Sequence, residues 1–272
     1  MRRAPTIAAF VLVLLLALVP LYWMVQVSFK PNPEITQQGT LYPHTFTVDN
    51  YDRLFAERSF GSYLRNSVVV TAASVAVSLA LGSLAAYAIA RFRLWRRIER
   101  RIGLALLTAR IVPAVVIVVP VYLLVLQLGL LNTWLGLIIV YTAFNVSFVV
   151  WMMESFFREI PVDLEEAAMV DGDSRLTAFR RIVLPLAAPG LAATAVFAVI
   201  VTFNEFLFAL VLTSTPAAMT VPRGAATLIG RIDVDWGAMS AAGVVAALPI
   251  VIFALLVQRH LVRGLTFGAV KG

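Results

Sequence analysis

Six long apolar runs constrain the fold of this chain more than any other feature. A membrane-spanning α-helix needs roughly 17–25 mostly apolar residues, and each run reaches that length. The runs occupy residues 7–28, 66–90, 103–129, 134–157, 186–213 and 239–260. The sequence therefore predicts an all-α membrane protein with six transmembrane helices, in which residues 1–272 form a single domain.

The composition agrees with a bilayer environment and excludes several kinds of site. The chain is 61% hydrophobic and 14% charged, whereas globular domains are about 45–50% apolar and about 25% charged. The absence of cysteine excludes disulfides, thiolate metal sites and cysteine nucleophiles. With two histidines in the whole chain, no metal site is expected. The first apolar run continues too far to be a signal-peptide core, so we interpret it as a membrane helix.

The basic residues indicate the orientation of the helices. They fall in short clusters between the apolar runs, a placement that does not favour nucleic acid as a partner. If both termini are cytoplasmic, 15 of the 22 Lys and Arg residues lie inside and six lie outside, as the positive-inside rule expects. Residues 158–185 are then cytoplasmic, and residues 29–65 and 214–238 are external.

Two ionisable groups lie inside the predicted spans on either side of a short turn. Arg110 and Glu154 are each 22 residues from Asn132, so an antiparallel hairpin would place them at similar depth. Charged side chains are costly inside a membrane. We therefore predict an intramembrane ion pair between Arg110 and Glu154. The alternative is that each side chain extends separately to the nearby interface.

A polar segment, residues 158–190, interrupts the apolar sequence between the fourth and fifth spans. Asp163 and Glu166 have the spacing of a capping box, which predicts the start of a short helix. Gly172 is expected to end this helix, and Ser174 can cap a second one that runs to Leu184. The result would be a helical elbow over residues 161–185, lying as an amphipathic surface element or docking into a groove of a partner.

The same segment resembles a known motif. The string EAAMVDG, residues 166–172, is separated by nine residues from IVLP. This pattern resembles the EAA motif of the permease subunits of binding-protein-dependent ABC importers. In that family the motif forms a cytoplasmic coupling helix that contacts the ATP-hydrolysing subunit. The resemblance implies this ATPase-coupling role for Glu166, Ala167, Ala168, Asp171 and Gly172, with Glu166 forming a salt bridge and Gly172 forming the bend.

Further strings extend the resemblance over almost the whole chain. They are NS at 66–67, AAYAIAR at 85–91, LGLLNT at 128–133, NEF at 204–206 and GLTFGAVKG at 264–272. Together they resemble the maltose-transporter-like carbohydrate permeases. The resemblance implies two ABC ATPase subunits, a second homologous permease and an extracytoplasmic sugar-binding protein as partners. It also implies that the loop before the last helix reaches the binding protein, with Thr215, Pro216, Met219 and Thr220 as contact candidates.

Polar residues in the fifth and fourth spans are candidates for the substrate path. Asn204 and Glu205 are flanked by Phe203, and Asn145 lies in the fourth span. Amide and carboxylate groups beside an aromatic ring are typical of sugar-binding sites. The alternative for each of these residues is an interhelical hydrogen bond, worth roughly 0.6–2 kcal/mol in a membrane.

Together these features predict the transmembrane subunit of an ATP-driven importer in the cytoplasmic (inner) membrane. It would pass a carbohydrate or polyol from an external binding protein to the cytoplasm by alternating access. The chain contains no GxxxxGK[ST] string, so ATP and magnesium are expected in the partner ATPase, no cofactor is expected to bind directly, and the subunit is not expected to be an enzyme. The alternative is an ion-gradient-driven secondary transporter, with Glu205 or Arg110 as the coupling charge.

Overall fold

The computed structural model describes residues 3–37, 39–92, 101, 108, 111–230 and 234–267. All elements of the described residues are helices, and the only β pairing among these residues is an isolated bridge between Ile229 and Val234. In chain order the elements are α1 (Arg3–Ser28), α2 (Asn32–Gln37), α3 (Asp49–Ala56), α4 (Phe60–Arg91), α6 (Ala114–Gln127), α7 (Trp134–Glu159), α8 (Asp163–Val170), α9 (Arg175–Ala178), the π-helix η1 (Phe179–Val183), α10 (Leu184–Leu186), α11 (Ala188–Phe203), α12 (Leu207–Leu212), α13 (Val221–Ala225), the 3₁₀ helix η2 (Ala226–Leu228) and α14 (Trp236–Phe267).

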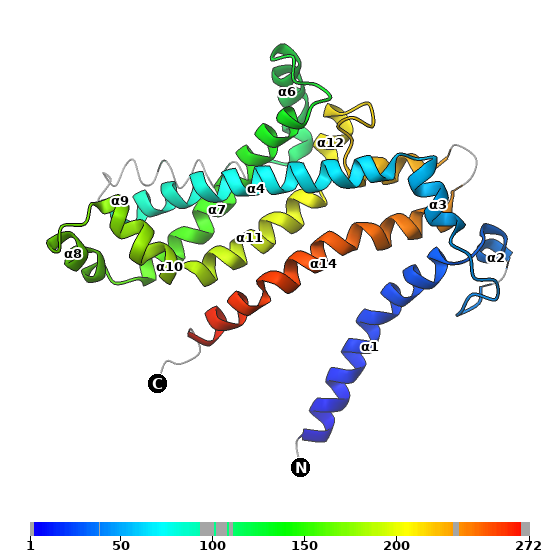
Figure 1. The fold of residues 1–272 in the computed structure, drawn as a ribbon, viewed down its shortest axis with the longest axis horizontal. Helices are drawn as coiled ribbons and strands as arrows, with labels where there is room; N and C mark the ends of the chain where they lie inside the picture. The colour runs from blue at the N-terminus through cyan, green and yellow to red at the C-terminus, as the bar shows by residue number, and fades with distance from the viewer. Residues whose placement is uncertain are drawn as a thin grey trace.

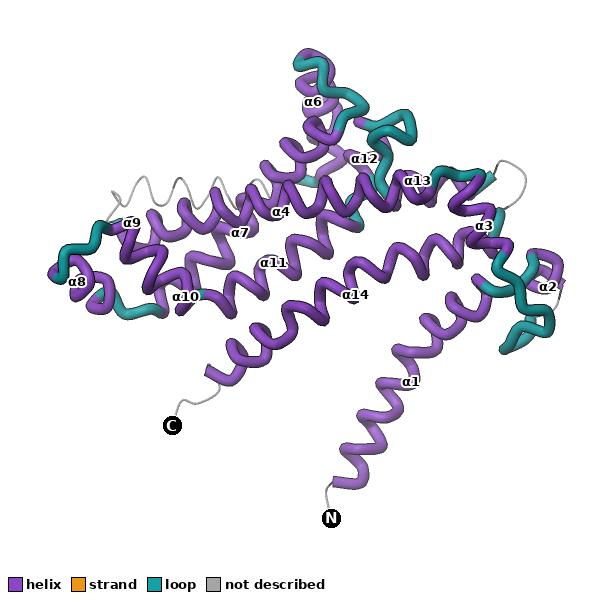
Figure 2. Tube along the Cα trace, viewed as in Figure 1, coloured by secondary structure: helices purple, strands orange, loops and turns teal. Residues whose placement is uncertain are grey.

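The long helices lie roughly side by side, with the connecting loops at their ends (Figures 1 and 2). Helix α4 packs along α7, and α11 contacts α4, α7 and α14. Helix α1 contacts α14 but diverges from the other helices toward its N-terminus (Figure 1). The elements α8, α9 and α10 lie at one end of the long axis, and α2 and α3 lie at the other.

Helix α4 contributes to each of the three clusters of buried apolar residues. One cluster joins Phe60 and Tyr63 to α3 and α14, a second joins Ala86 and Tyr87 to α7 and η1, and a third joins Val70 to α6, α7 and α12. Close contact between α4 and α7 depends on Gly82, because a Cβ there would lie 2.6 Å from Val149 Cβ. Helix α4 is therefore the central element of the fold.

The long helices confirm four of the predicted spans by length and composition. They are Pro5–Ser28, Phe60–Arg91, Trp134–Glu159 and Trp236–Gln258. A fifth candidate combines Arg175–Leu186 with Ala188–Phe203, two segments that meet at 75°. Within the described residues, the predicted third span contains α6, which is 14 residues long, and the helical residues Thr108 and Ile111 before it. Residues 103–107, 109 and 110 of that span lie outside the described residues, so the count of six stays a prediction.

The fifth predicted span, residues 186–213, is wrong as a continuous helix. Helix α11 ends at Phe203 and α12 begins at Leu207, with Asn204, Glu205 and Phe206 in between. The backbone breaks because the Glu205 carboxylate accepts hydrogen bonds from the first N–H groups of α12. These contacts replace the intrahelical bonds that a continuous helix would make.

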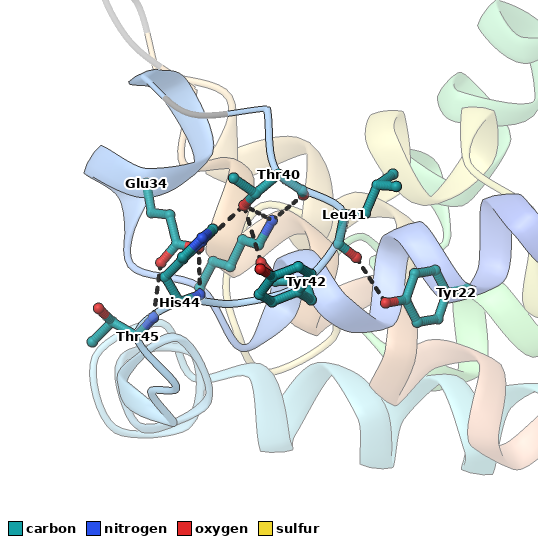
Figure 3. Close-up of polar contacts among 8 residues, drawn as sticks. Tyr22, Glu34, Thr40, Leu41, Tyr42, His44 and Thr45 are labelled. Atoms are coloured by element: carbon teal, nitrogen blue, oxygen red, sulfur yellow. Dashed lines mark hydrogen bonds and ion pairs between the residues drawn. The ribbon is translucent and has the colours of Figure 1, made fainter.

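A compact polar cluster ties down the segment that follows α1 (Figure 3). The buried Glu34 carboxylate accepts from the backbone N–H of His44 at 2.8 Å and from that of Thr45 at 3.1 Å. Tyr22 Oη donates to the Leu41 carbonyl at 2.7 Å. The hydrogen bond from the His44 N–H is the main cause that lowers the pKa of Glu34 below its ordinary value of 4.5. The folded loop is therefore more stable when the Glu34 carboxylate is ionised than when it is protonated.

Acidification is therefore expected to loosen residues 39–47. The lowered pKa of Glu34 contributes stability that is present above the ordinary value of 4.5 and is lost as the pH falls through the lowered value. A nitroxide on Leu41→Cys, in a chain without other cysteines, should report low mobility at pH 7 and rising mobility as the pH is lowered stepwise below 4.5. A Glu34→Gln variant should be mobile throughout this range. Mobility that is equal in the Glu34 protein and the Glu34→Gln variant at pH 7 would contradict this prediction.

Candidate coupling elbow and transport path

The segment between α7 and α11 contains two short helices, α8 and α9, which are joined by a turn at Gly172. We call residues 161–185 the elbow. Helix α8 ends in a Schellman motif: the Gly172 N–H donates to the Met169 carbonyl at 3.2 Å, and the Asp173 N–H donates to the Ala168 carbonyl at 2.9 Å. Gly172 has a φ of +98°, which a residue with a side chain rarely adopts. The glycine therefore sets the direction in which the chain leaves α8.

Of the two helix starts in the elbow, that of α9 agrees with the sequence prediction and that of α8 does not. Ser174 caps α9 as predicted, accepting from the Thr177 N–H at 3.2 Å. The capping box of Asp163 and Glu166 is wrong, because Val162 is the N-cap and its side chain makes no capping bond. Asp163 lies instead in the first turn, where a carboxylate still interacts favourably with the helix dipole. The second limb also differs, since α9 continues into the π-helix η1.

The residues assigned to ATPase coupling mostly face outward. Glu166, Ala167, Asp171 and Gly172 are exposed, whereas Ala168 is buried. Exposed apolar side chains accompany them: Val170 is 86% exposed and Leu164 is 44% exposed. Helix α8 and its C-terminal turn therefore expose carboxylates, small residues and apolar side chains together.

Glu165, next to the motif glutamate, is buried instead and ties α8 to α4. Its Oε1 lies 2.5 Å from Arg91 Nε, and its Oε2 accepts a hydrogen bond from Tyr87 Oη. Arg91 Nη2 also donates to the Ile160 carbonyl at 2.9 Å. Removing one partner of a buried ion pair costs roughly 3–5 kcal/mol. The local sequence does not distinguish Glu165 from Glu166; the available signal is that Tyr87 and Arg91 stand four apart in the string AAYAIAR, on one helix face.

Aromatic side chains join the same end of α4 to α7 and η1. The rings of Tyr87 and Phe179 lie 4.5 Å apart, and that of Phe157 packs against both. The Arg175 guanidinium lies 5.4 Å from the centroid of the Phe92 ring. The C-terminal end of α4 is therefore bound to α7, α8, α9 and η1 through polar and aromatic contacts.

Glu205 stabilises the break in the fifth span through hydrogen bonds to its carboxylate. Its carboxylate accepts from the backbone N–H of Phe208 at 3.0 Å and from that of Ala209 at 3.2 Å. Tyr141 Oη of α7 donates to the same carboxylate at 2.8 Å. Four residues along α7, Asn145 Nδ2 donates to Thr202 Oγ1 at 2.7 Å. Glu205 and Asn145 thus form a polar seam between α7 and the fifth span.

The other two candidates for the substrate path lie apart from this seam. The exposed Asn204 donates to the Ile200 carbonyl of its own helix at 2.8 Å. Phe203 is buried and lines a cavity of about 530 Å³ between α4, α11 and α14. Thr71 supplies a hydroxyl to a lining that is otherwise made of apolar side chains. The described residues therefore bring Asn145 and Glu205 together but do not gather all four candidates around one polar cavity.

Two asparagines hold the loop before α13 in place: Asn66 of the string NS and Asn132 of the string LGLLNT. Asn66 Nδ2 donates to the carbonyls of Pro216 and Met219. Asn132 Oδ1 accepts from the backbone N–H groups of Ser214 and Thr215, both at 3.0 Å. The candidates Thr215 and Pro216 are exposed at the tip, while Met219 and Thr220 are buried. These hydrogen bonds connect the loop to α4 and to the turn between α6 and α7.

The predicted intramembrane pair can be described from one side only. Arg110 lies outside the described residues. Glu154 forms an ion pair with Arg158, four residues along α7, with Arg158 Nη2 at 2.7 Å from Glu154 Oε1. An i,i+4 pair of this kind accounts for the position of Glu154 at the end of α7.

Comparison with known proteins identifies the family. Residues 60–267 match the family model described as binding-protein-dependent transport system inner membrane component. The chain belongs to this family. This inner-membrane component is 40% identical over 258 residues to the trehalose transport system permease protein SugB of Mycobacterium tuberculosis (strain CDC 1551 / Oshkosh), covering 94% of this chain and 93% of that protein. It is 36% identical to the trehalose/maltose transport system permease protein MalG of Thermococcus litoralis (strain ATCC 51850 / DSM 5473 / JCM 8560 / NS-C), covering 100% and 98% of the two chains.

A solved structure shares the fold of this inner-membrane component. The crystal structure of a bacterial ABC transporter involved in the import of the acidic polysaccharide alginate matches with a TM-score of 0.78 at 24% identity, over 95% of this chain and 98% of that chain. The likeness establishes an ABC-importer permease fold. The relatives are permease proteins, which are components of transport systems, and the resemblance seen in the sequence is confirmed.

Proposed function

We propose that this permease is the transmembrane subunit of an ATP-driven importer for a carbohydrate or polyol. The elbow carries this proposal: α8 displays Glu166, Ala167 and Asp171 on its exposed face, and Gly172 fixes its exit at a φ of +98°. An exposed, rigidly mounted helix of this kind suits a cleft on a partner ATPase. The substrate class is supported by the relatives, whose names refer to trehalose and maltose.

The proposed assembly contains more than this chain. We propose two ATPase subunits that hold ATP and magnesium, a second homologous permease, and an external binding protein that meets the loop tip at Thr215 and Pro216. The permease itself would bind no cofactor, consist of one six-helix domain and keep both termini in the cytoplasm. The four long apolar helices and the bent pair would account for five spans, and the segment that ends with α6 would complete the sixth.

Alternating access would follow from movement of the elbow. Closure of the ATPase subunits would push on α8 and rock the helices around the substrate path, for which Asn204, Glu205, Phe203 and Asn145 stay the candidates. The rival ion-driven mechanism needs a charge that binds and releases an ion. Glu205 is engaged by two backbone N–H groups and Tyr141, so it does not favour that rival.

Uptake by right-side-out vesicles tests the proposed function. Vesicles that contain the complex should accumulate labelled trehalose, maltose or a related sugar from a panel when ATP is inside and the binding protein is outside. A protonophore should leave the initial rate unchanged. Uptake that follows an imposed ion gradient without ATP would overturn the proposal and favour the secondary transporter.

A further inference from the structure

The elbow is attached to the membrane helices by more than its chain connections. Along the chain it follows α7 through the non-helical residues 160–162 and precedes α11 at the bend between α10 and α11. The buried polar contact of α8 is made with a third helix, α4, which ends about 70 residues earlier in the sequence. There Glu165 meets Arg91 and Tyr87.

The burial of this contact makes it hard to separate. The side chains of Arg91 and Glu165 are 4% and 5% exposed, and Tyr87 is buried with them. A buried charge is stable only while it is paired, so drawing α8 away from α4 would leave a carboxylate and a guanidinium without partners. The elbow also contacts α7, through the apolar packing of Phe179 against Phe157. The contact with α4 is therefore the one whose separation would leave charges unpaired.

Helix α4 is also placed to pass a displacement on. Its residues belong to all three buried apolar clusters, which reach α3, α6, α7, α12 and α14. Closely interdigitated side chains transmit strain from one helix to its neighbours. A displacement of the Arg91 end of α4 would thus also displace side chains in the helices that pack against α4.

We propose that Arg91, Tyr87 and Glu165 form a clamp that makes the elbow move together with α4, so that motion of the ATPase enters the membrane through α4. This proposal rests on the proposed function, because it assumes that an ATPase acts on the elbow. These three are positioning residues: they face away from the exposed surface that carries Glu166. The two neighbouring glutamates of α8 would then have separate tasks, with Glu166 facing the ATPase and Glu165 facing the permease.

Distance measurements test the clamp without needing transport. Spin labels are placed at Asp163→Cys on α8 and at Leu84→Cys on α4, both exposed sites in a chain without native cysteine. In the assembled complex, the clamp predicts a narrow distance distribution that Glu165→Gln broadens and Glu166→Gln does not. Equal distributions in all three proteins, measured without nucleotide, would overturn the clamp whether or not the chain is an importer.

ATP then tests the shared movement. A reference pair, Asp163→Cys with Leu255→Cys on α14, should change its distance when ATP binds, while the α8–α4 distance stays constant. A change of several ångströms between α8 and α4 in the protein with Glu165 would overturn the proposal. In complexes that retain the ATPase, Glu165→Gln should lower substrate uptake per ATP hydrolysed on the order of tenfold, within the range of typical coupling between sites.

These readouts separate two kinds of failure. If the distance between the reference labels does not change with ATP and no ATP is hydrolysed, the proposed function fails. The distance distributions measured without nucleotide then still test whether the clamp exists. If Glu165→Gln instead keeps full uptake per ATP, the proposed function stands and the clamp is overturned.

Discussion

A Gly172→Pro variant should lose most of its partner ATPase while its membrane helices stay folded. Proline fixes φ near −65°, whereas Gly172 adopts +98°, and proline also removes the N–H that bonds to Met169. Losing the positive φ and this N–H together is expected to destabilise the folded elbow by about 3 kcal/mol. This corresponds to a roughly hundredfold decrease in the population of the elbow that can dock. The amount of ATPase that co-purifies with the tagged chain measures the effect.

The turn that follows α6 offers a matched control. Gly129, with a φ of +67°, follows α6 in the same Schellman arrangement, in which its N–H donates to Leu126 and that of Leu130 donates to Val125. A Cβ at Gly129 or at Gly172 would meet nothing within 4 Å. Gly129→Pro should therefore impose the same local strain and leave the ATPase bound. Equal loss in both variants would indicate general misfolding and contradict the elbow's special role.

A Glu205→Ala variant should reduce substrate uptake by about tenfold or more, since a tenfold change needs only about 1.4 kcal/mol. Losing the acceptor for the first N–H groups of α12 costs about 0.5–2 kcal/mol, and leaving the buried Tyr141 hydroxyl without its partner costs about 1–3 kcal/mol. Both losses destabilise the break in the fifth span. Initial uptake rates and the melting temperature of the purified complex measure the two effects.

Glu205→Gln separates a structural role of this side chain from a role of its charge. The glutamine carbonyl oxygen can still accept from the backbone of α12 or from Tyr141, so this variant should keep most of the uptake and stability that Glu205→Ala loses. If glutamine is as damaging as alanine for uptake while the melting temperature is unchanged, the negative charge itself is required. That result would contradict the structural account and restore Glu205 as an ion or substrate ligand.

The sequence predicts those features that depend on local pattern. The apolar runs indicate the long helices, since a span needs a fixed length of apolar residues. Gly172 and Ser174 mark a helix end and a helix start because a left-handed turn and a cap each need few residue types. The Val162 start of α8 differs from the predicted Asp163 by one residue, and helix boundaries commonly shift by that amount.

Other features depend on contacts between distant segments, which no local pattern encodes. Glu165 and Glu166 are adjacent and chemically identical, and only the approach of α4 decides that Glu165 is buried against Arg91. The break at 204–206 lies within a long apolar run, and its cause includes a hydroxyl from Tyr141 on another helix. Glu205, three residues before Phe208, could have indicated a helix start, because a carboxylate at that position can cap a helix. The apolar residues on both sides favoured a continuous span instead.

Mass spectrometry of the proteins that co-purify with the tagged chain from its native membrane, after gentle extraction, tests the central claim most directly. The account predicts an ATPase with a Walker motif and a second permease of the same family in stoichiometric amounts. It also predicts that Gly172→Pro, but not Gly129→Pro, removes the ATPase. A chain that purifies alone and transports substrate without an ATPase would contradict the account.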